Sequence, residues 1–137
     1  MLKKSILVLF ALTLTLPAFA GNTYDKYGNQ TGSFKMNDGR VTTYDKYGNQ
    51  TGSYKNNGDR INSYDQYGNQ TGSIKMEENG GKFLDKYGNQ IGSFKNNNGR
   101  ITTYDKYGNQ TGSLKQNSDG TYTQMDKYGN NIGKFRL

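Results

Sequence analysis

The sequence predicts an all-β fold, a tandem array of six β-hairpin repeats of about twenty residues, after a cleaved signal peptide. Three observations support this prediction. One segment recurs at a fixed step, turn residues return about every ten positions, and the N-terminal segment differs in composition from the rest. Both a meander of hairpins and a β-solenoid fit this pattern. Glycine-centred turns at both ends of each strand favour the meander.

The first element is the N-terminal segment, residues 1–20. Lys3 and Lys4 precede an apolar run, and Pro17 ends that run before Ala18-Phe19-Ala20, a small-residue cleavage site. An uncleaved anchor and a buried helix are the alternatives, but the run falls short of the roughly 20 apolar residues that span a bilayer. We therefore expect residues 21–137 to form the mature chain, secreted or held in the periplasm or at the cell surface, with no transmembrane segment after cleavage.

The repeat covers the whole of residues 21–137. The segment from Tyr24 to Lys35 returns almost unchanged, with copies that start near residues 24, 44, 64, 84, 104 and 125. Each copy begins with Asp-x-x-Gly, as in Asp25-Lys26-Tyr27-Gly28, which is typical of a type I turn closed by a left-handed glycine. A second turn, such as Asn37-Asp38-Gly39, follows about ten residues later.

Each predicted strand carries about one large apolar side chain, and these are expected to stack into ladders between neighbouring repeats. One strand series is Phe34, Tyr54, Ile74, Phe94, Leu114 and Phe135, and the other is Val41, Ile61, Phe83, Ile101 and Tyr122. The turn tyrosines are expected to form a third ladder. A mid-strand glycine, Gly32 in the first copy, is expected to seat the tyrosine of the adjacent unit.

The residue inventory argues against an enzyme. The chain contains no histidine and no cysteine, which removes the usual nucleophile–base pairs and the common zinc ligands. The aspartates at Asp25 and its equivalents are copies of one turn position, so turn capping explains them. Calcium is the alternative, but one carboxylate per loop is few for such a site. No catalytic residue, metal or cofactor is therefore expected.

Two periodic sets of side chains are candidate binding residues. The first is an aromatic set for sugar rings or cations: Tyr27, Tyr47, Tyr67, Tyr87, Tyr107 and Tyr128. The second is a cationic file: Lys35, Lys55, Lys75, Lys95, Lys115 and Arg136. The net charge of +7 becomes +5 when Lys3 and Lys4 leave with the signal, and nucleic acid is not expected because the cations are evenly spaced.

These features predict an exported, non-enzymatic binding or adhesive module. Its expected partner is a repetitive envelope glycan or anionic polymer, which identical groups at a fixed step would contact many times over. The alternative is a self-assembling fibre or amyloid-like surface protein, whose partner is itself. That alternative depends on unpaired strand edges at the ends of an open array, and on stacked Asn and Gln side chains.

The unit resembles a known repeat family. The segments Gly39 to Asn49 and Gly99 to Asn109 are similar to the YD repeats of Rhs-type proteins, which carry Tyr-Asp followed by Gly-Asn or Gly-Arg. In that family long arrays wind into a hollow shell, for which six copies are too few. The Asp-x-x-Gly turn followed by a Thr-Gly strand is also similar to choline-binding cell-wall repeats, although the chain has no Trp. A further similarity is to curli-type repeats, which are exported and rich in Asn, Gln and Gly.

Overall fold

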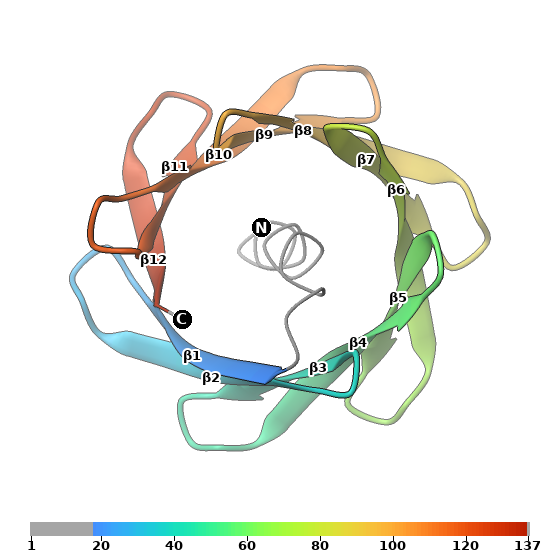
Figure 1. Ribbon diagram of the computed structural model, residues 1–137, viewed down its shortest axis with the longest axis horizontal. Helices are drawn as coiled ribbons and strands as arrows, with labels where there is room; N and C mark the ends of the chain where they lie inside the picture. The colour runs from blue at the N-terminus through green and yellow to red at the C-terminus, as the bar shows by residue number, and fades with distance from the viewer. Residues whose placement is uncertain (1–17, 137) are drawn as a thin grey trace.

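In a computed structural model of the protein, residues 18–136 are described and form twelve β-strands (Figure 1). The predicted signal peptide lies outside the described residues except for its last three, which begin β1. Of the described part, no segment forms a helix long and apolar enough to cross a membrane. The strands are β1 Ala18–Tyr24, β2 Gln30–Asn37, β3 Arg40–Asp45, β4 Gln50–Asn57, β5 Arg60–Asp65, β6 Gln70–Glu77, β7 Gly80–Asp85, β8 Gln90–Asn97, β9 Arg100–Asp105, β10 Gln110–Gln116, β11 Tyr122–Asp126 and β12 Asn131–Arg136.

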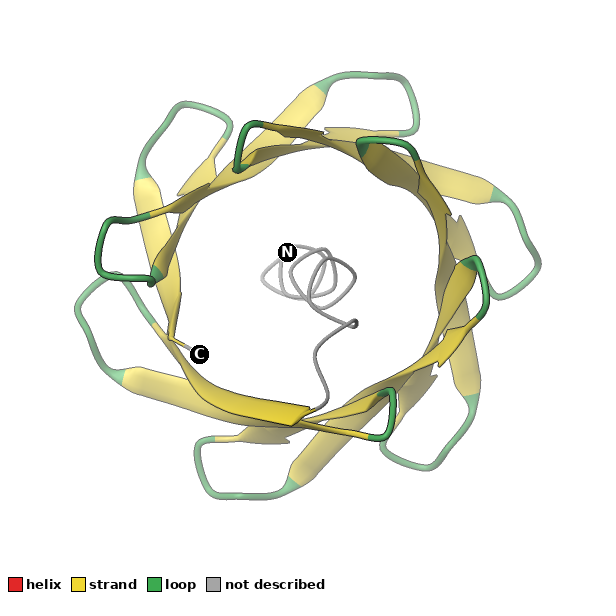
Figure 2. Cartoon of the chain, viewed as in Figure 1, coloured by secondary structure: helices red, strands yellow, loops and turns green. Residues whose placement is uncertain are grey.

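The strands form a single closed sheet. Each strand pairs antiparallel with its neighbours in sequence, and β1 pairs with β12 to complete the ring (Figure 2). The closing register joins Asn22 to Arg136, Thr23 to Phe135 and Tyr24 to Lys134. The prediction of an all-β array of repeated hairpins is confirmed, and of its two forms the structure is the meander, closed into a barrel.

The two kinds of turn lie at opposite ends of the barrel. Because strands alternate in direction, all six Asp-x-x-Gly loops fall at one rim and the other five turns, which we call the short turns, at the opposite rim. Figure 1 shows the Asp loops flaring outward at the end away from the viewer. We call this end the tyrosine rim, after its residues Tyr27, Tyr47, Tyr67, Tyr87, Tyr107 and Tyr128.

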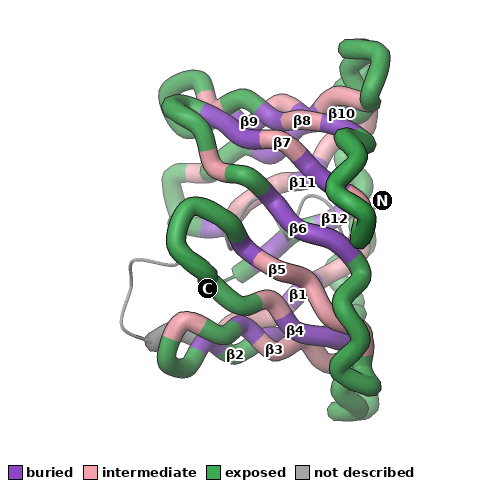
Figure 3. Tube along the Cα trace, turned by 90° about the vertical axis from the view of Figure 1, so that its right-hand side faces the viewer, coloured by how far each residue is buried: buried purple, intermediate pink, exposed green. Residues whose placement is uncertain are grey.

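Alternation along each strand separates a buried inner face from an outer face. In β2 the side chains of Phe34 and Met36 are buried, whereas Lys35 between them is exposed. The same alternation runs around the barrel, so the middle of most strands is buried and the loops at the rims are exposed (Figure 3). The inner face carries two neighbouring apolar clusters that share Tyr54. The large side chains therefore bury between units, as predicted for the two strand series.

One member of the second series was misplaced by sequence spacing. Counted back from Asp85, the residue equivalent to Val41 is Gly81, and Phe83 occupies the position of Thr43. The third copy therefore has a small residue where the first has Val41 and a large one where the first has Thr43. The ring of Phe94 lies over Gly81, where an added Cβ would be 2.6 Å from Cε1 of the ring, and Phe83 packs on Phe94 at 5.5 Å between centroids.

The mid-strand glycines do not seat tyrosine rings, so that prediction is wrong. A Cβ on Gly52 would lie 2.7 Å from the backbone carbonyl oxygen of Tyr64, and the equivalents Gly32, Gly72, Gly92 and Gly112 meet the matching carbonyl at 2.5 to 2.7 Å. Each unit also has one register shift beside its Asp loop, as between Thr43 and Tyr44. This register shift is a β-bulge, and the glycine beside it leaves room for the backbone of the next unit, as glycines in strands often do.

Candidate functional site

The Asp loops are held by their own aspartate. In the second copy, Asp45 Oδ1 accepts the backbone N–H groups of Tyr47 and Asn49 at 2.9 Å, and Oδ2 accepts the side-chain amide of Asn49 at 3.2 Å. The N–H of Gly48 donates to the Asp45 carbonyl at 3.1 Å, and Gly48 has a φ of +88°. This confirms the predicted turn with its left-handed glycine. The same bonds recur at Asp25, Asp65, Asp85, Asp105 and Asp126.

These hydrogen bonds favour the ionised carboxylate. The backbone N–H of Asn49 is the largest cause that holds the pKa of Asp45 below its ordinary value of 3.8, against a smaller opposing effect of desolvation. The other five loop aspartates have lowered pKa values for the same leading reason. Six ionised carboxylates therefore preserve one loop shape around the rim.

The rim tyrosines are almost free of protein contact. Tyr47 is 78% exposed and the other five are 76–79% exposed. The prediction that they stack into a ladder is therefore wrong, because they sit at the outward-flaring loop tips and not between strands. They are the largest exposed aromatic surfaces of the described chain, repeated at one end of a rigid barrel.

A lysine accompanies most of these rings. The Nζ of Lys46 lies 5.1 Å from the centroid of the Tyr47 ring, within cation–π range. The same pairing occurs at Tyr27, Tyr87, Tyr107 and Tyr128, at 5.1 to 5.2 Å. The third copy differs because Gln66 precedes Tyr67.

The structure does not bring the two predicted sets together. The cationic file lies on the outer wall within β2, β4, β6, β8, β10 and β12, and all its members are exposed. The rim tyrosines lie in the loops at one end. The two sets predicted from the sequence therefore form two separate surfaces, a ring of aromatics at one end and a wall of cations.

Sequence reasoning missed the wall arginines Arg40, Arg60 and Arg100. Each begins the strand after a short turn, so the signal was present as an arginine at a fixed place in three units. What the sequence did not show was their neighbour. In the sheet register Arg40 is directly opposite Lys55, Arg60 is opposite Lys75 and Arg100 is opposite Lys115.

The described residues offer no cluster that resembles a metal site. From residue 18 to residue 136 there is no group of three or more His, Cys, Asp or Glu side chains that could hold an ion. In each Asp loop both carboxylate oxygens already accept hydrogen bonds from the loop itself, as at Asp45. Turn capping thus accounts for the geometry of these aspartates.

No family model, curated protein or solved structure matches this chain. The resemblance to YD repeats consequently stays a prediction. The function has to be argued from the two surfaces themselves.

Proposed function

We propose that the protein is an exported, non-enzymatic binding module that holds an envelope glycan at its tyrosine rim. The observation that supports this best is the exposure of six equivalent rings, 76–79% each, at one end of a closed barrel. Exposed apolar surface that recurs at one end of a protein is a common mark of an interaction site. Sugar rings present flat apolar faces that suit such platforms, with the hydroxyl of tyrosine available for a hydrogen bond.

The loop geometry supports binding because the rings are presented on fixed supports. Asp45 ties its loop at three points, so little backbone entropy remains to be lost when a ligand contacts Tyr47. Neighbouring copies are separated by two strands, about 10 Å along the sheet. A glycan with several similar residues would meet several rings at once, and weak contacts then add through effective concentration.

The test is retention of the protein on immobilised envelope polysaccharides. Changing Tyr47, Tyr67 and Tyr107 together to Ala should weaken retention about tenfold or more, because three ring contacts of roughly 0.5–1.5 kcal/mol each exceed the ~1.4 kcal/mol of a tenfold change. The matched control changes the same three positions to Phe, which keeps the ring and should keep most of the retention. Equal retention of the Ala and Phe variants would refute the rim as the binding surface.

Self-assembly remains the alternative function, and the closed sheet does not favour it. The expectation of a fibre depended on unpaired strand edges, but β1 pairs with β12 and every described strand has two neighbours. Sedimentation with thioflavin fluorescence separates the two proposals. A dye-negative, monodisperse protein at high concentration is expected for the binding module.

A further inference from the structure

The outer wall of the barrel carries at least one cationic side chain in every repeat and few acidic side chains. The cationic file supplies one exposed Lys or Arg per unit, and Arg40, Arg60 and Arg100 add a second in three units. We call these nine side chains the outer belt. The six loop aspartates lie at the tyrosine rim and most other acids lie in the short turns, so the strands of the wall are left strongly positive.

The belt places like charges against each other. Arg40 and Lys55 are directly opposite on β3 and β4, and the same holds for Arg60 with Lys75 and for Arg100 with Lys115. Like charges opposite each other in a sheet are destabilising. Among the described residues the one ion pair joins Lys82 Nζ to Glu77 Oε2 at 3.8 Å, and it includes no belt residue. Among residues 18–136, none of these three like-charge pairs has an acid in an ion pair with either member.

Two of the three arginines, Arg40 and Arg100, are also oriented by hydrogen bonds. Arg40 Nη1 donates to Ser53 Oγ on the adjacent β4 at 3.0 Å, and its guanidinium lies 5.7 Å from the centroid of the Tyr64 ring on β5. Ser53 is only 3% exposed. Arg100 donates to Ser113 in the equivalent place at 3.5 Å. A guanidinium that is already oriented loses less entropy when it meets an anion.

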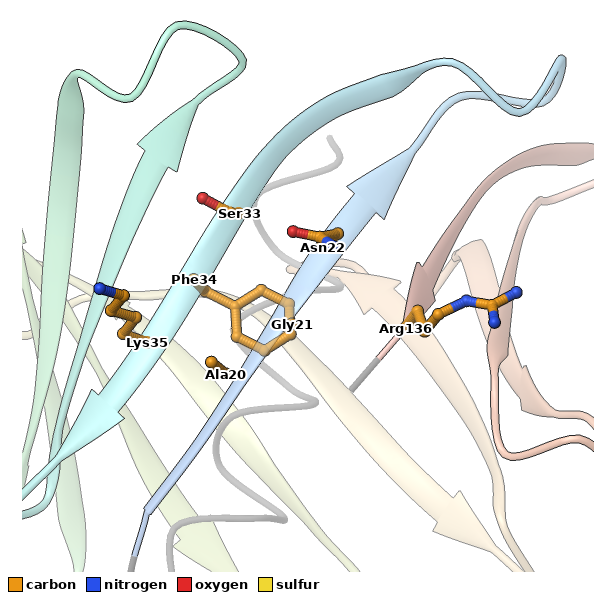
Figure 4. Close-up of a pocket in the computed structure, with 7 residues that line it drawn as sticks. All are labelled: Ala20, Gly21, Asn22, Ser33, Phe34, Lys35 and Arg136. Carbon is orange, nitrogen blue, oxygen red and sulfur yellow. The ribbon is translucent and has the colours of Figure 1, made fainter.

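The belt is hollowed where the barrel closes. Between Lys35 on β2 and Arg136 on β12, the intervening β1 carries Ala20, Gly21 and Asn22 in the full chain (Figure 4), and cleavage after Ala20 would leave the amino group of Gly21 at this place. The register puts Lys35 opposite Ala20 and Arg136 opposite Asn22, so both cations share one face with this gap. The hollow has a volume of about 440 Å³. That is room for a bulky charged group between two cations.

We propose that the outer belt binds a linear anionic polysaccharide, which wraps along the wall and places its carboxylate or sulfate groups on the belt cations. A polymer fits this surface because the belt curves around a closed barrel. A flat lipid bilayer would touch only a few strands at a time, whereas a flexible chain follows the curve. The cations recur about every 10 Å, two strands per unit, which suits regularly spaced charges. This site is separate from the tyrosine rim and holds whether or not the rim binds sugar.

The test compares two variants with the same change in charge. The belt variant changes Lys55, Lys75 and Lys115 to Gln, which removes one member of each repulsive pair and leaves the arginine contacts intact. The control changes Lys46, Lys86 and Lys106 to Gln at the tyrosine rim. Affinity for soluble heparin, a sulfated chain, and for polygalacturonate, a carboxylated chain, is measured over a series of salt concentrations. The belt variant should bind about tenfold more weakly and with a shallower salt dependence, and the control should change less than twofold.

Thermal unfolding provides the second readout. The belt variant should melt at the same or a higher temperature than the parent, because repulsion is relieved, so lost binding cannot be attributed to unfolding. Equal weakening by both variants would overturn the proposal, since net charge alone would then explain binding. So would tighter binding to anionic phosphatidylglycerol vesicles or to single-stranded DNA than to either polysaccharide. Loss of binding in the rim Tyr-to-Ala variant alone would support the rim and overturn the belt.

Discussion

Replacing Gly52 by Ala tests how one repeat fits against the next. The added methyl would lie 2.7 Å from the Tyr64 carbonyl oxygen, and since that atom belongs to the backbone the two strands have to move apart. Overpacking of this kind costs about 1–3 kcal/mol. Replacing glycine also restricts the unfolded chain, which returns about 0.4–1 kcal/mol. The net loss should be about 1–2 kcal/mol, or a fall in melting temperature of about 4–8 °C for a domain of this size.

The control is Gly58→Asn in the neighbouring short turn. Nothing lies within 4 Å of a Cβ on Gly58, and Asp38 and Asn98 already occupy the same turn position with positive φ. This change should be nearly neutral. Urea unfolding followed by circular dichroism measures both variants, and the slope should stay constant. Because the sites are distant, Gly52→Ala and Gly112→Ala should add. A Gly52→Ala protein as stable as the Gly58→Asn control would refute the close approach of the carbonyl.

Three further predictions concern stability in acid, Gly81 in the third copy, and the N-terminal residues. The loop aspartates have lowered pKa values in the folded state, so the stability they contribute is present above about pH 4 and is lost as the pH falls below 3.8. Changing Asp45, Asp65 and Asp105 to Asn should therefore reduce the loss of stability between pH 4 and lower pH. An unchanged loss of stability in acid would contradict this. Gly81→Val should destabilise the folded protein by about 1–3 kcal/mol, because the new side chain meets the Phe94 ring. Adding Phe94→Leu should recover part of that loss in a double-mutant cycle. If the two changes in the free energy of unfolding simply add, the Phe94 ring does not cover Gly81. A chain of residues 21–137 should keep the barrel, because all three pairs between β1 and β12 lie after residue 20; loss of the β signal in circular dichroism would show that residues 18–20 are needed.

The turns and the alternation of the strands could be predicted from the sequence. Asp45 and Gly48 predict their loop because a carboxylate that caps backbone N–H groups and a residue free to adopt positive φ are local requirements. The two series of apolar strand residues could be predicted from the spacing of apolar residues. The assignment of Phe83 is wrong because the equivalent position has to be counted back from the loop residue Asp85, and that position is Gly81. A compensated exchange within one unit is invisible to spacing alone.

Closure and the separation of the two surfaces were not predictable in the same way. Whether β1 meets β12 depends on the twist and bulge summed over all six units, which no single copy reveals. Tyr47 was ambiguous because tyrosine suits both a half-buried strand and an exposed loop tip. The belt appeared only when the register placed Arg40 against Lys55, residues that are fifteen positions apart in the sequence.

Because the barrel is closed by repeated hairpins, the number of repeats sets its diameter. Each unit adds two strands and one bulge, so gain or loss of a copy changes the circumference in steps of about 10 Å without altering any local contact. The strand count stays even, so the start of β1 and the end of β12 always lie at the end of the barrel opposite the tyrosine rim. Duplication or loss of a repeat would therefore produce wider or narrower rings that present the same loops, and the number of loops and wall cations offered to a ligand would scale with the number of repeats.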